Sequence, residues 1–459
     1  MRTPGWISRR KSLGLLAVLA LTLGLAACGG ASSSSQPAGA GYSVGGTITG
    51  LAAGTSVTLL NNGGDALTVN GSGPFAFATR LAGGASYAVT LRAQPAHQTC
   101  TVSHGTGTVS ADVTTVAVDC IADASFVLVA NQGGNNVSVY RVDSTTGALT
   151  PVAGSPFTAG LGPTSVAANP AGTLAFVANM AGNDVSVFRI DAATGALTQV
   201  AGSPFAAGAS PDSVTINPTG TLAFVANANT NNVSVFRIDA TTGALTQVAG
   251  SPFTTGTAPA SVALDPTGTL AFVADEAGNG LSVFRVDATS GALTQVAGSP
   301  FATGTTPSSV VVNPAGTLAL VANGSDNDVS VFSIDAATGM LTQVAGSPFL
   351  AGATPSSVAV NPAGTLAFAA NAGGNSVSVF RLDGLTGGLT QVAGSPFLAG
   401  ASPRCVSVNP LGTLAFAVDK SGNDVSVYDI DAATGALTPV AGSPFATGTS
   451  PLCATVVQP

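Results

Sequence analysis

Short segments in which apolar and polar residues alternate occur along most of the chain. One of them, "DSVTIN" at 212–217, places Val214 and Ile216 on one side of an extended segment and Ser213 and Thr215 on the other. Alternation with a period of two is typical of a β-strand with one buried face. Turns rich in Gly, Pro and Asn separate these segments, and no long stretch of strong helix formers follows the N-terminal segment. The pattern predicts an all-β protein.

One phrase recurs at a fixed spacing. "LTQVAGSPF" or "LTPVAGSPF" occurs seven times, and its GSPF glycine falls every 48 residues, at 154, 202, 250, 298, 346, 394 and 442. Each period holds four strand-like segments. A repeat of this length with four strands is typical of a β-propeller. Residues 123–459 are therefore predicted to form seven blades.

One repeat defines the four strands of a blade, named a to d from the channel outward. Strand a is "DSVTIN" (212–217), strand b "TLAFVAN" (221–227), strand c "VSVFRID" (233–239) and strand d "LTQVAGSPF" (245–253). The first and last copies carry Pro in place of Gln on strand d. An outer-edge strand tolerates this residue because its amides lack ladder partners. We expect the Phe of GSPF to pack between adjacent blades.

The two ends of the repeat region are complementary. The first repeat begins with a strand b, "SFVLVAN" (125–131), and the chain ends in a strand-a segment, "PLCATVVQP" (451–459). We expect the C-terminal strand to complete blade 1 and remove an exposed edge. Cys405 and Cys453 occupy equivalent positions of neighbouring inner strands. Because a disulfide needs Cα atoms within about 7 Å, the sequence leaves open whether they are bonded.

The N-terminal segment has the features of an export signal. Residues 1–27 combine a basic start with the apolar run "LGLLAVLALTLGL", and "LAAC" ends at Cys28. This resembles the bacterial lipoprotein signal, which implies lipidation of Cys28. Residues 28–41 are predicted to be a flexible tether. Residues 42–122 contain strand-like pieces at short spacing and are predicted to form a small β-sandwich.

The remaining cysteines fit an oxidising compartment. Cys100 and Cys120 are predicted to form a disulfide, and closing a loop of about 20 residues stabilises a domain by roughly 3 kcal/mol. His97 and His104 flank Cys100, but no carboxylate lies nearby at ligand spacing. We therefore interpret them as exposed loop histidines.

The net negative charge of the chain argues against some classes of binding partner. The net charge is −8, and removal of the four cationic residues in 1–27 brings it to −12. No basic patch remains, which argues against nucleic acid and against anionic lipid headgroups as partners. The predicted membrane partner is reached through the acyl chains. We expect an exported protein, lipid-anchored to a bacterial membrane and facing the periplasm or the cell surface.

The repeat resembles the seven-bladed lactonase-type propellers, including the group named for YVTN motifs. The motif position reads "FVAN" (176–179 and 224–227), "FVAD" (272–275), "LVAN" (320–323) or "FAAN" (368–371). The resemblance implies a propeller fold and lactone hydrolysis by His, Arg and Glu near the channel. The predicted propeller contains no His and a single Glu, Glu276. No residue is therefore assigned as catalytic.

The turns at one end of the blades vary between repeats. The b–c turns and d–a loops, here called the variable face, differ in sequence, whereas the a–b and c–d turns hardly change. A ligand without seven-fold symmetry needs an asymmetric surface, so this face is the candidate site. Ca²⁺ could be bound there by Asp326 and Asp328, and no other cofactor is expected. The candidate ligand residues are Asp212, Asp275, Glu276, Asp326, Asp328, Arg404 and Lys420.

Five arginines recur on strand c, each two residues before an Asp. Their position lies outside the channel-lining strand, so we expect Arg–Asp pairing or solvated charge on the outer face rather than an anion-binding ring. The arginines are Arg141, Arg189, Arg237, Arg285 and Arg381.

Two hypotheses lead, and a third, a purely structural or adhesive surface protein, stays open. The first is a monomeric, lipid-anchored envelope propeller that binds a small ligand or an envelope protein without catalysis, because no residue set for proton transfer is evident. The alternative is a lactonase-like hydrolase of sugar lactones that uses an aspartate, Arg404 and ordered water, and its basis is fold resemblance.

Overall fold

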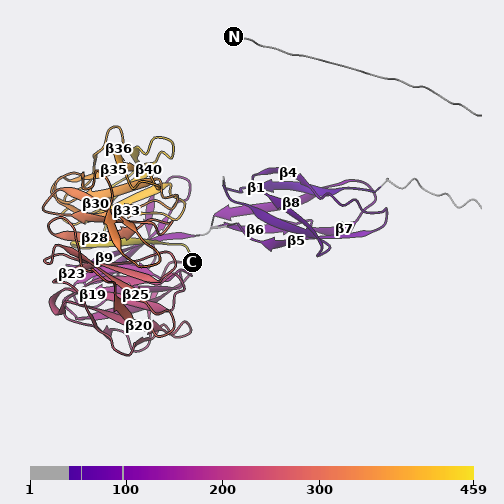
Figure 1. Ribbon diagram of the computed structural model, residues 1–459. Helices are drawn as coiled ribbons and strands as arrows, with labels where there is room; N and C mark the ends of the chain where they lie inside the picture. Colours follow the sequence, from indigo (N-terminus) through magenta and orange to yellow (C-terminus); the bar gives the residue numbers. More distant parts are fainter. Residues whose placement is uncertain (1–40, 53, 96–97, 123) are drawn as a thin grey trace, which may run out of the picture.

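The computed structural model describes residues 41–52, 54–95, 98–122 and 124–459. Within these ranges the chain forms β-strands and one 3-10 turn, η1 (Ala228–Thr230). Across the same residues, no helix has the length and apolar character needed to cross a membrane. Figure 1 shows a smaller part made of the first strands beside a larger ring of sheets. Cys28 and His97 lie outside the described residues.

The smaller part consists of two four-stranded sheets around one core. The core includes Val44, Ile48, Leu59 and Val118, all almost fully buried. The first sheet has the order β4 (Gly73–Ala76), β1 (Val44–Thr49), β8 (Val113–Ala122), β6 (Gln98–Ser103), and the second β3 (Asp65–Val69), β2 (Val57–Asn61), β5 (Ser86–Ala93), β7 (Thr106–Thr108).

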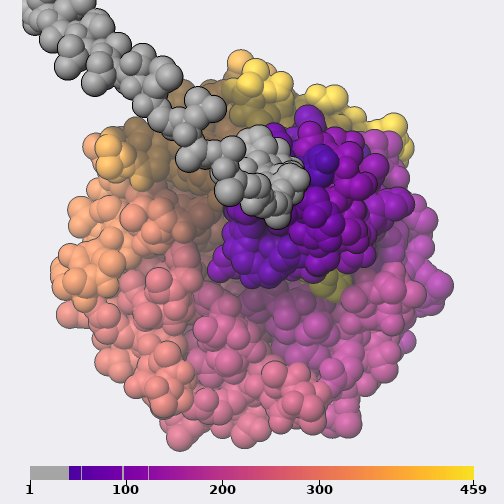
Figure 2. Space-filling model, turned by 90° about the vertical axis from the view of Figure 1, so that its right-hand side faces the viewer, coloured from indigo at the N-terminus to yellow at the C-terminus, as the bar shows by residue number. Residues whose placement is uncertain are grey.

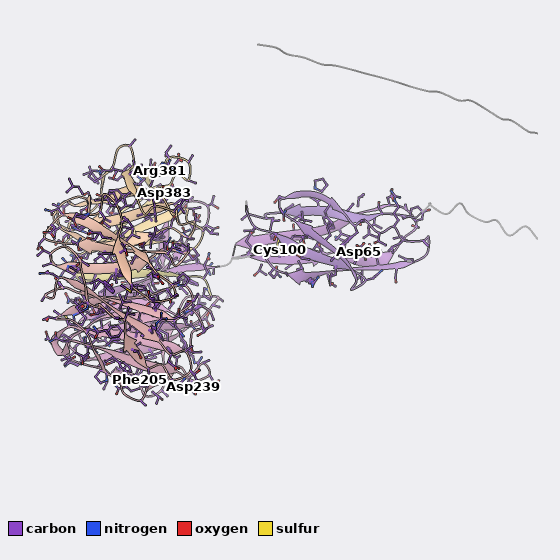
Figure 3. All side chains as sticks on the ribbon, viewed as in Figure 1. Asp65, Cys100, Phe205, Asp239, Arg381 and Asp383 are labelled. Atoms are coloured by element: carbon purple, nitrogen blue, oxygen red, sulfur yellow. A yellow bond between two sulfur atoms is a disulfide. The ribbon has the colours of Figure 1, made fainter. Side chains whose placement is uncertain are left out.

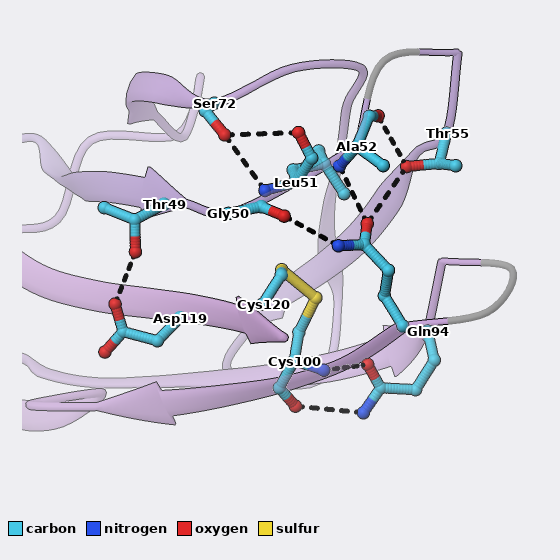
Figure 4. Close-up of a disulfide and its surroundings, with 11 residues drawn as sticks. Thr49, Gly50, Leu51, Ala52, Thr55, Ser72, Gln94, Cys100, Asp119 and Cys120 are labelled. Carbon is cyan, nitrogen blue, oxygen red and sulfur yellow. Dashed lines mark hydrogen bonds between the residues drawn. A yellow bond between two sulfur atoms is a disulfide. The ribbon is translucent and has the colours of Figure 1, made fainter. Parts of the chain in front are cut away.

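A disulfide joins two neighbouring strands of the first sheet. Cys100 on β6 lies directly opposite Cys120 on β8, and their sulfur atoms are bonded. Figure 4 shows that the Gln94 side chain brackets Cys100: it accepts from the Cys100 amide at 2.8 Å and donates to the Cys100 carbonyl at 3.0 Å. The bond therefore fixes the C-terminal half of β8, from which the chain continues into the larger part.

Residues 125–457 form seven sheets arranged in a ring, within the part of the chain that the structure describes. The all-β, seven-bladed fold is confirmed. Each sheet has the order a–b–c–d, and strand b is the most buried because sheets cover both of its faces. In blade 3 these strands are β18 (Pro211–Ile216), β19 (Leu222–Asn227), β20 (Asn232–Ile238), and the outer pieces β21 (Leu245–Gln247) and β22 (Phe253–Thr254).

The other blades repeat this order. Blade 1 is β43 (Pro451–Val457), β9 (Ser125–Asn131), β10 (Asn136–Val142), β11 (Leu149–Pro151), β12 (Phe157–Thr158); blade 2 is β13 (Pro163–Ala168), β14 (Leu174–Asn179), β15 (Asp184–Ile190), β16 (Leu197–Gln199), β17 (Phe205–Ala206); blade 4 is β23 (Pro259–Leu264), β24 (Leu270–Asp275), β25 (Gly280–Val286), β26 (Leu293–Gln295), β27 (Phe301–Ala302). Blade 5 is β28 (Pro307–Val312), β29 (Leu318–Asn323), β30 (Asp328–Ile334), β31 (Leu341–Gln343), β32 (Phe349–Leu350); blade 6 is β33 (Pro355–Val360), β34 (Leu366–Asn371), β35 (Ser376–Leu382), β36 (Leu389–Gln391), β37 (Phe397–Leu398); blade 7 is β38 (Pro403–Val408), β39 (Leu414–Asp419), β40 (Asp424–Ile430), β41 (Leu437–Pro439), β42 (Phe445–Ala446).

The predicted single strand d is wrong in detail. In every blade the nine-residue phrase forms two short pieces that pair with strand c, separated by a turn with a cis Ser–Pro peptide. The GSPF glycine takes a positive φ, near 83° at Gly202, which a residue with a side chain rarely adopts. In the gap between the two pieces the Val187 carbonyl accepts from the Val200 amide, and the Val187 amide donates to Ser203 Oγ at 2.9 Å in place of a strand partner. The phrase is repeated because each blade needs this replacement bond.

The ring closes as the ends of the chain predict. The C-terminal β43 pairs with β9, so blade 1 combines the first and last segments of the propeller. Pro151 and Pro439 are the prolines that replace Gln in the first and last copies of the nine-residue phrase, and they lie on the outermost strands β11 and β41. Both positions agree with the sequence-based prediction.

Seven apolar clusters hold neighbouring blades together, counted over the described residues. In the cluster between blades 2 and 3, Phe176 and Val187 of blade 2 pack with Val214 and Phe236 of blade 3. Phe205, the phenylalanine of GSPF, packs against this cluster. Phe205 is labelled near the rim of the ring in Figure 3. The GSPF phenylalanines therefore pack between blades, as the repeat predicts.

Hydrogen bonds between polar groups also join neighbouring blades at every junction. On the variable face, the asparagine before strand c has a positive φ, and its side-chain oxygen accepts from the loop that enters the next blade; Asn183 accepts from the Ser210 amide at 2.8 Å. On the outer side, Arg189 donates to the Thr241 carbonyl in the next blade. The other four strand-c arginines make the same bond to a c–d turn carbonyl of the next blade. Among the described residues their partner is thus a backbone carbonyl, and the predicted Arg–Asp ion pair is not formed.

Candidate functional site

The axial cavity is lined mainly by the second and third residues of the seven a strands. Its volume is about 170 Å³. Second-position residues are Thr164, Asp212, Ala260, Ser308, Ser356, Arg404 and Leu452, and third-position residues are Ser165, Ser213, Ser261, Ser309, Ser357, Cys405 and Cys453. Glu276, from the b–c turn of blade 4, completes the lining. The lining is polar and contains no aromatic residue.

Strand direction places the cavity toward the variable face. Strand a begins at the d–a loop, and its first residue, Pro211, pairs with Asn227 at the end of strand b. The second residue of strand a therefore lies close to the b–c turns. The chain enters the propeller at Ser125, the opposite end of a b strand. Figure 2 views that opposite face and shows residues 42–122, in purple, over part of it. The variable face is consequently left uncovered by this part of the chain.

The third-position serines connect successive blades. Ser165 Oγ accepts from the Val214 amide at 3.3 Å, and Ser213 Oγ accepts from the Val262 amide at the same distance. Ser261, Ser309 and Ser357 repeat the contact with the next blade. Each serine uses its oxygen as an acceptor, so its hydroxyl hydrogen stays available to a ligand.

In the two blades without a third-position serine, cysteines hold this position and form a disulfide. Cys405 and Cys453 hold the third position in blades 7 and 1, and their sulfur atoms are bonded with Cα atoms 4.9 Å apart. The bond therefore links blade 7 to the C-terminal strand in the cavity wall. It also lies next to Arg404 in the sequence.

Two of the second-position residues, Ala260 and Leu452, are apolar, and the five polar ones divide into two groups. Thr164, Ser308 and Ser356 each donate to a backbone carbonyl of the next blade, for example Ser356 to Pro403 at 2.9 Å. Asp212 and Arg404 take no part in such bonds. They lie in blades 3 and 7, on nearly opposite sides of the ring, so their side chains are free to act on a molecule in the cavity.

Asp212 has an unusual environment for a carboxylate. Burial and the negative charge of Glu276 raise its pKa from 3.8 to about 6, and Arg404 partly opposes the rise. No hydrogen bond to its carboxylate is found among the described residues. Glu276 and Arg404 are exposed at the cavity mouth. The cavity thus holds a carboxylate that changes charge near neutral pH, with a guanidinium and a second carboxylate around it.

Three of the seven predicted site residues therefore meet in one cavity: Asp212, Glu276 and Arg404. Lys420 follows strand b of blade 7 and does not line the cavity. Asp326 accepts from the Thr305 amide at 2.5 Å, and Asp328 accepts from the Asn323 side chain at 2.7 Å. These acids hold the turns of blade 5, and no group of three or more potential metal ligands occurs in the described ranges.

Asp275 belongs to a buried position that recurs in all blades. Five blades have Asn at the end of strand b, and its amide donates to the first and third residues of strand c; Asn179 donates to Asp184 at 2.7 Å and to Ser186 at 2.9 Å. Asp275 instead accepts from Ser282 at 2.7 Å, and burial raises its pKa to about 6. It is a structural group beneath the d–a loop, outside the cavity.

Sequence reasoning missed two features of the molecule. In the sequence, the third-position serines match the polar side of an alternating strand. Their convergence on the axial cavity is evident only once the seven blades are arranged in a ring. Asp419 and Asp424 were not singled out, although they replace the Asn–Asp pair of blades 2 and 5 with two carboxylates. Asp419 is fully buried, and burial together with Asp424 raises its pKa to about 7. Comparing the repeats column by column would have found this pair.

The fold and cavity define a seven-bladed propeller with a polar axial site. The chain belongs to the family described as lactonase, 7-bladed beta-propeller, whose family model matches residues 91–206, 204–252, 248–354 and 345–456. A search of curated proteins finds no match.

Solved structures share this fold at low sequence identity. A candidate 6-phosphogluconolactonase from Bacteroides uniformis is 20% identical, with a TM-score of 0.64 over 73% of this chain and 100% of that one. A candidate 6-phosphogluconolactonase from Bacteroides fragilis is 21% identical, with a TM-score of 0.63 over 73% of this chain and 98% of that one. The periplasmic gluconolactonase of Pseudomonas aeruginosa is 19% identical, with a TM-score of 0.62 over 73% and 100%. These similarities concern the fold.

Proposed function

We propose that this protein hydrolyses small lactones in the axial cavity. The observation that carries the proposal is Asp212, a poorly solvated carboxylate whose pKa is raised to about 6 and which faces Arg404 across the cavity. A general base works best when its pKa lies near the operating pH. The sequence of the propeller, residues 123–459, contains no histidine, which favoured a non-catalytic protein. A carboxylate with this pKa removes that obstacle to proton transfer at neutral pH.

Asp212 acts as the base in the first step. Its carboxylate takes a proton from a water molecule as the water oxygen attacks the lactone carbonyl carbon. The carbonyl π-bond opens and leaves a tetrahedral oxyanion. The bond from carbon to the ring oxygen then breaks, and protonated Asp212 returns the proton to that oxygen. The products are a carboxylic acid and a hydroxyl group on one open chain, so one water molecule is consumed for each lactone.

Arg404 supplies the positive charge for the oxyanion. Its guanidinium carries a positive charge and several N–H donors, and its position across the ring allows the lactone carbonyl to lie between it and Asp212. Removing one such donor from an acyl-transfer site typically lowers kcat by about 10²–10³. Glu276 contributes through its charge, because its proximity keeps the pKa of Asp212 high.

The family supports this hypothesis over a purely binding function. The chain belongs to a lactonase family, and relatives of the same fold include a gluconolactonase. A binding module without catalysis would need no carboxylate poised for proton transfer in its cavity. The uncovered variable face also gives a small substrate access to the site.

The test is a proton-release assay on residues 42–459 with simple γ- and δ-lactones and aldonolactones. We expect turnover above the spontaneous rate, and a fall of about 10²–10⁴ in Asp212→Asn. Asp326→Asn is the matched control, because it removes one carboxylate from the same face outside the cavity. Absence of turnover across the panel, or equal activity of Asp212→Asn and the control, would refute the proposal.

The location of the enzyme is part of the proposal. Cys28 in "LAAC" would carry the acyl chains, and residues 28–41 would separate the folded parts from the membrane. The chain enters the propeller on the face opposite the cavity mouth. A membrane tether on that side would leave the cavity open to solvent.

A further inference from the structure

The charged residues of the cavity restrict the substrate. This inference rests on the proposed lactone hydrolysis and concerns the substrate class. The lining holds two carboxylates, Asp212 and Glu276, against one guanidinium, Arg404, and no other charged residue. Fully ionised, the site has a net charge of −1. Proteins that bind phosphate esters gather arginines, lysines or helix N-termini around the phosphate, and here the one guanidinium already faces Asp212.

A phosphate monoester would bring a charge of about −1.5 to −2 into this site at neutral pH. Glu276 lies close enough to Asp212 to affect its pKa, so a phosphate near either carboxylate would be repelled over a short distance. The net charge of the whole chain, −8, acts in the same direction on approach. An uncharged lactone meets neither obstacle.

The serine ring fits the hydroxyl groups of such a substrate. Ser165, Ser213, Ser261, Ser309 and Ser357 each have an oxygen occupied by an amide of the next blade. Their hydroxyl hydrogens can therefore be donated to a ligand from five of the seven blades, while the nearby carboxylates can only accept when ionised. A polyol oxygen can accept from a serine, and its own hydrogen can be donated to a carboxylate.

The size and surface of the cavity agree with this. Its volume of about 170 Å³ lies below the range of roughly 300–1,000 Å³ that is common for drug-sized ligands. The lining offers no aromatic platform for stacking. Hydrogen bonds must therefore provide most of the recognition, which favours a small, hydroxyl-rich molecule.

We propose that the substrate is an uncharged, polyhydroxylated lactone of single-sugar size, oriented by the third-position serines of the a strands, and that phosphorylated lactones are discriminated against by Glu276 at the cavity mouth and Asp212 inside it.

The experiment compares glucono-δ-lactone with its 6-phosphate on residues 42–459, each rate corrected for spontaneous hydrolysis. We expect kcat/KM to be at least tenfold higher for the neutral lactone. Glu276→Gln removes the exposed carboxylate of the lining. Its effect on the pKa of Asp212 applies to both substrates, so the ratio of the two rates isolates the effect on the phosphate: kcat/KM for the phosphorylated lactone should rise several-fold relative to the neutral one. Asp326→Asn changes the charge equally outside the cavity, and it should leave the ratio unchanged.

A second comparison tests the hydroxyl groups. δ-Valerolactone has the same ring size and no hydroxyls, and its rate enhancement over spontaneous hydrolysis should be at least tenfold lower than that of glucono-δ-lactone. Equal or better use of the phosphorylated lactone, or of δ-valerolactone, would overturn the inference while lactone hydrolysis itself stood. Absence of turnover with all three would instead refute the proposed function.

Discussion

Replacement of Asp419 by Asn should stabilise the propeller at alkaline pH. Asp419 is fully buried at the end of β39, opposite Asp424 on β40. One oxygen of each carboxylate is buried without a hydrogen-bond partner. The equivalent Asn179 donates to both Asp184 and Ser186 in blade 2. The amide introduced by Asp419→Asn can donate the same two hydrogen bonds, to Asp424 and to Ser426. The substitution therefore replaces two adjacent carboxylates by an amide that is hydrogen-bonded to one carboxylate.

The magnitude follows from the pKa. Burial and Asp424 raise the pKa of Asp419 from 3.8 to about 7. Since one pKa unit corresponds to 1.36 kcal/mol, ionisation of the folded protein costs about 4 kcal/mol above pH 7. A folded-state pKa above the unfolded value contributes stability that is complete below pH 3.8 and lost as the pH rises through about 7. The gain from Asp419→Asn should therefore be small at about pH 4.5 and reach about 4 kcal/mol at about pH 8.

Thermal unfolding at both pH values measures this gain. With about 2.1 cal/mol/K of unfolding entropy per residue, about 4 kcal/mol in a propeller of this length shifts Tm by about 6 °C. Asn179→Asp is the reciprocal control: it places a second carboxylate beside Asp184 and should lower Tm at pH 8 by a similar amount. A gain from Asp419→Asn that does not depend on pH, or a neutral Asn179→Asp, would refute the carboxylate-pair argument.

Three further predictions concern acid, the closing disulfide and the anchor. Backbone amides of the c–d turns hold the pKa of seven exposed aspartates, including Asp191 and Asp239, below 3.8, so their contribution to stability is present above about pH 4 and lost as the pH falls through the folded values. Because the raised pKa values of Asp212, Asp275 and Asp419 make stability fall as the pH rises above 3.8, Tm should be highest near about pH 4, and a Tm that rises steadily below that pH would contradict this. The double variant Cys405→Ser, Cys453→Ser should lower the propeller's stability by about 4 kcal/mol, the chain-entropy value for a loop of 48 residues, whereas Cys100→Ser with Cys120→Ser should leave the propeller's Tm unchanged; equal effects of the two pairs on that Tm would argue against the role of the closing bond. Cys28→Ser should abolish labelling by a palmitate analogue and release the protein from membranes, and persistent labelling would show that another residue is modified.

The repeat made the architecture predictable from sequence. A period of 48 residues with four strands fixed the number of blades, and the unpaired ends fixed the closure between β43 and β9. The division of the nine-residue phrase into two short strands was not predictable in the same way. Its split depends on Ser203 replacing a ladder bond to Val187, and a serine in a strand-like segment gives no indication of that contact.

The candidate site was predictable in part. Strand order and turn variability pointed to the variable face, where Asp212, Glu276 and Arg404 meet. Sequence reasoning could not separate them from Asp326 and Asp328, because all of them lie in or beside variable turns. The distinction depends on register: Asp212 and Arg404 are second residues of strand a, whereas Asp328 begins a strand c. The raised pKa of Asp212 depends on burial and on Glu276 of another blade, and neither can be read from local sequence.

The central claim is that Asp212 is the base of a lactone-hydrolysing cavity, and the dependence of kcat/KM on pH tests it most directly. With glucono-δ-lactone between pH 4.5 and 8, corrected for spontaneous hydrolysis, kcat/KM should rise with an inflection near pH 6 and then level off. Asp212→Asn should be about 10²–10⁴ lower without that inflection, while Asp326→Asn keeps the native profile. A native profile without an inflection near pH 6, or the same inflection in Asp212→Asn, would contradict the claim.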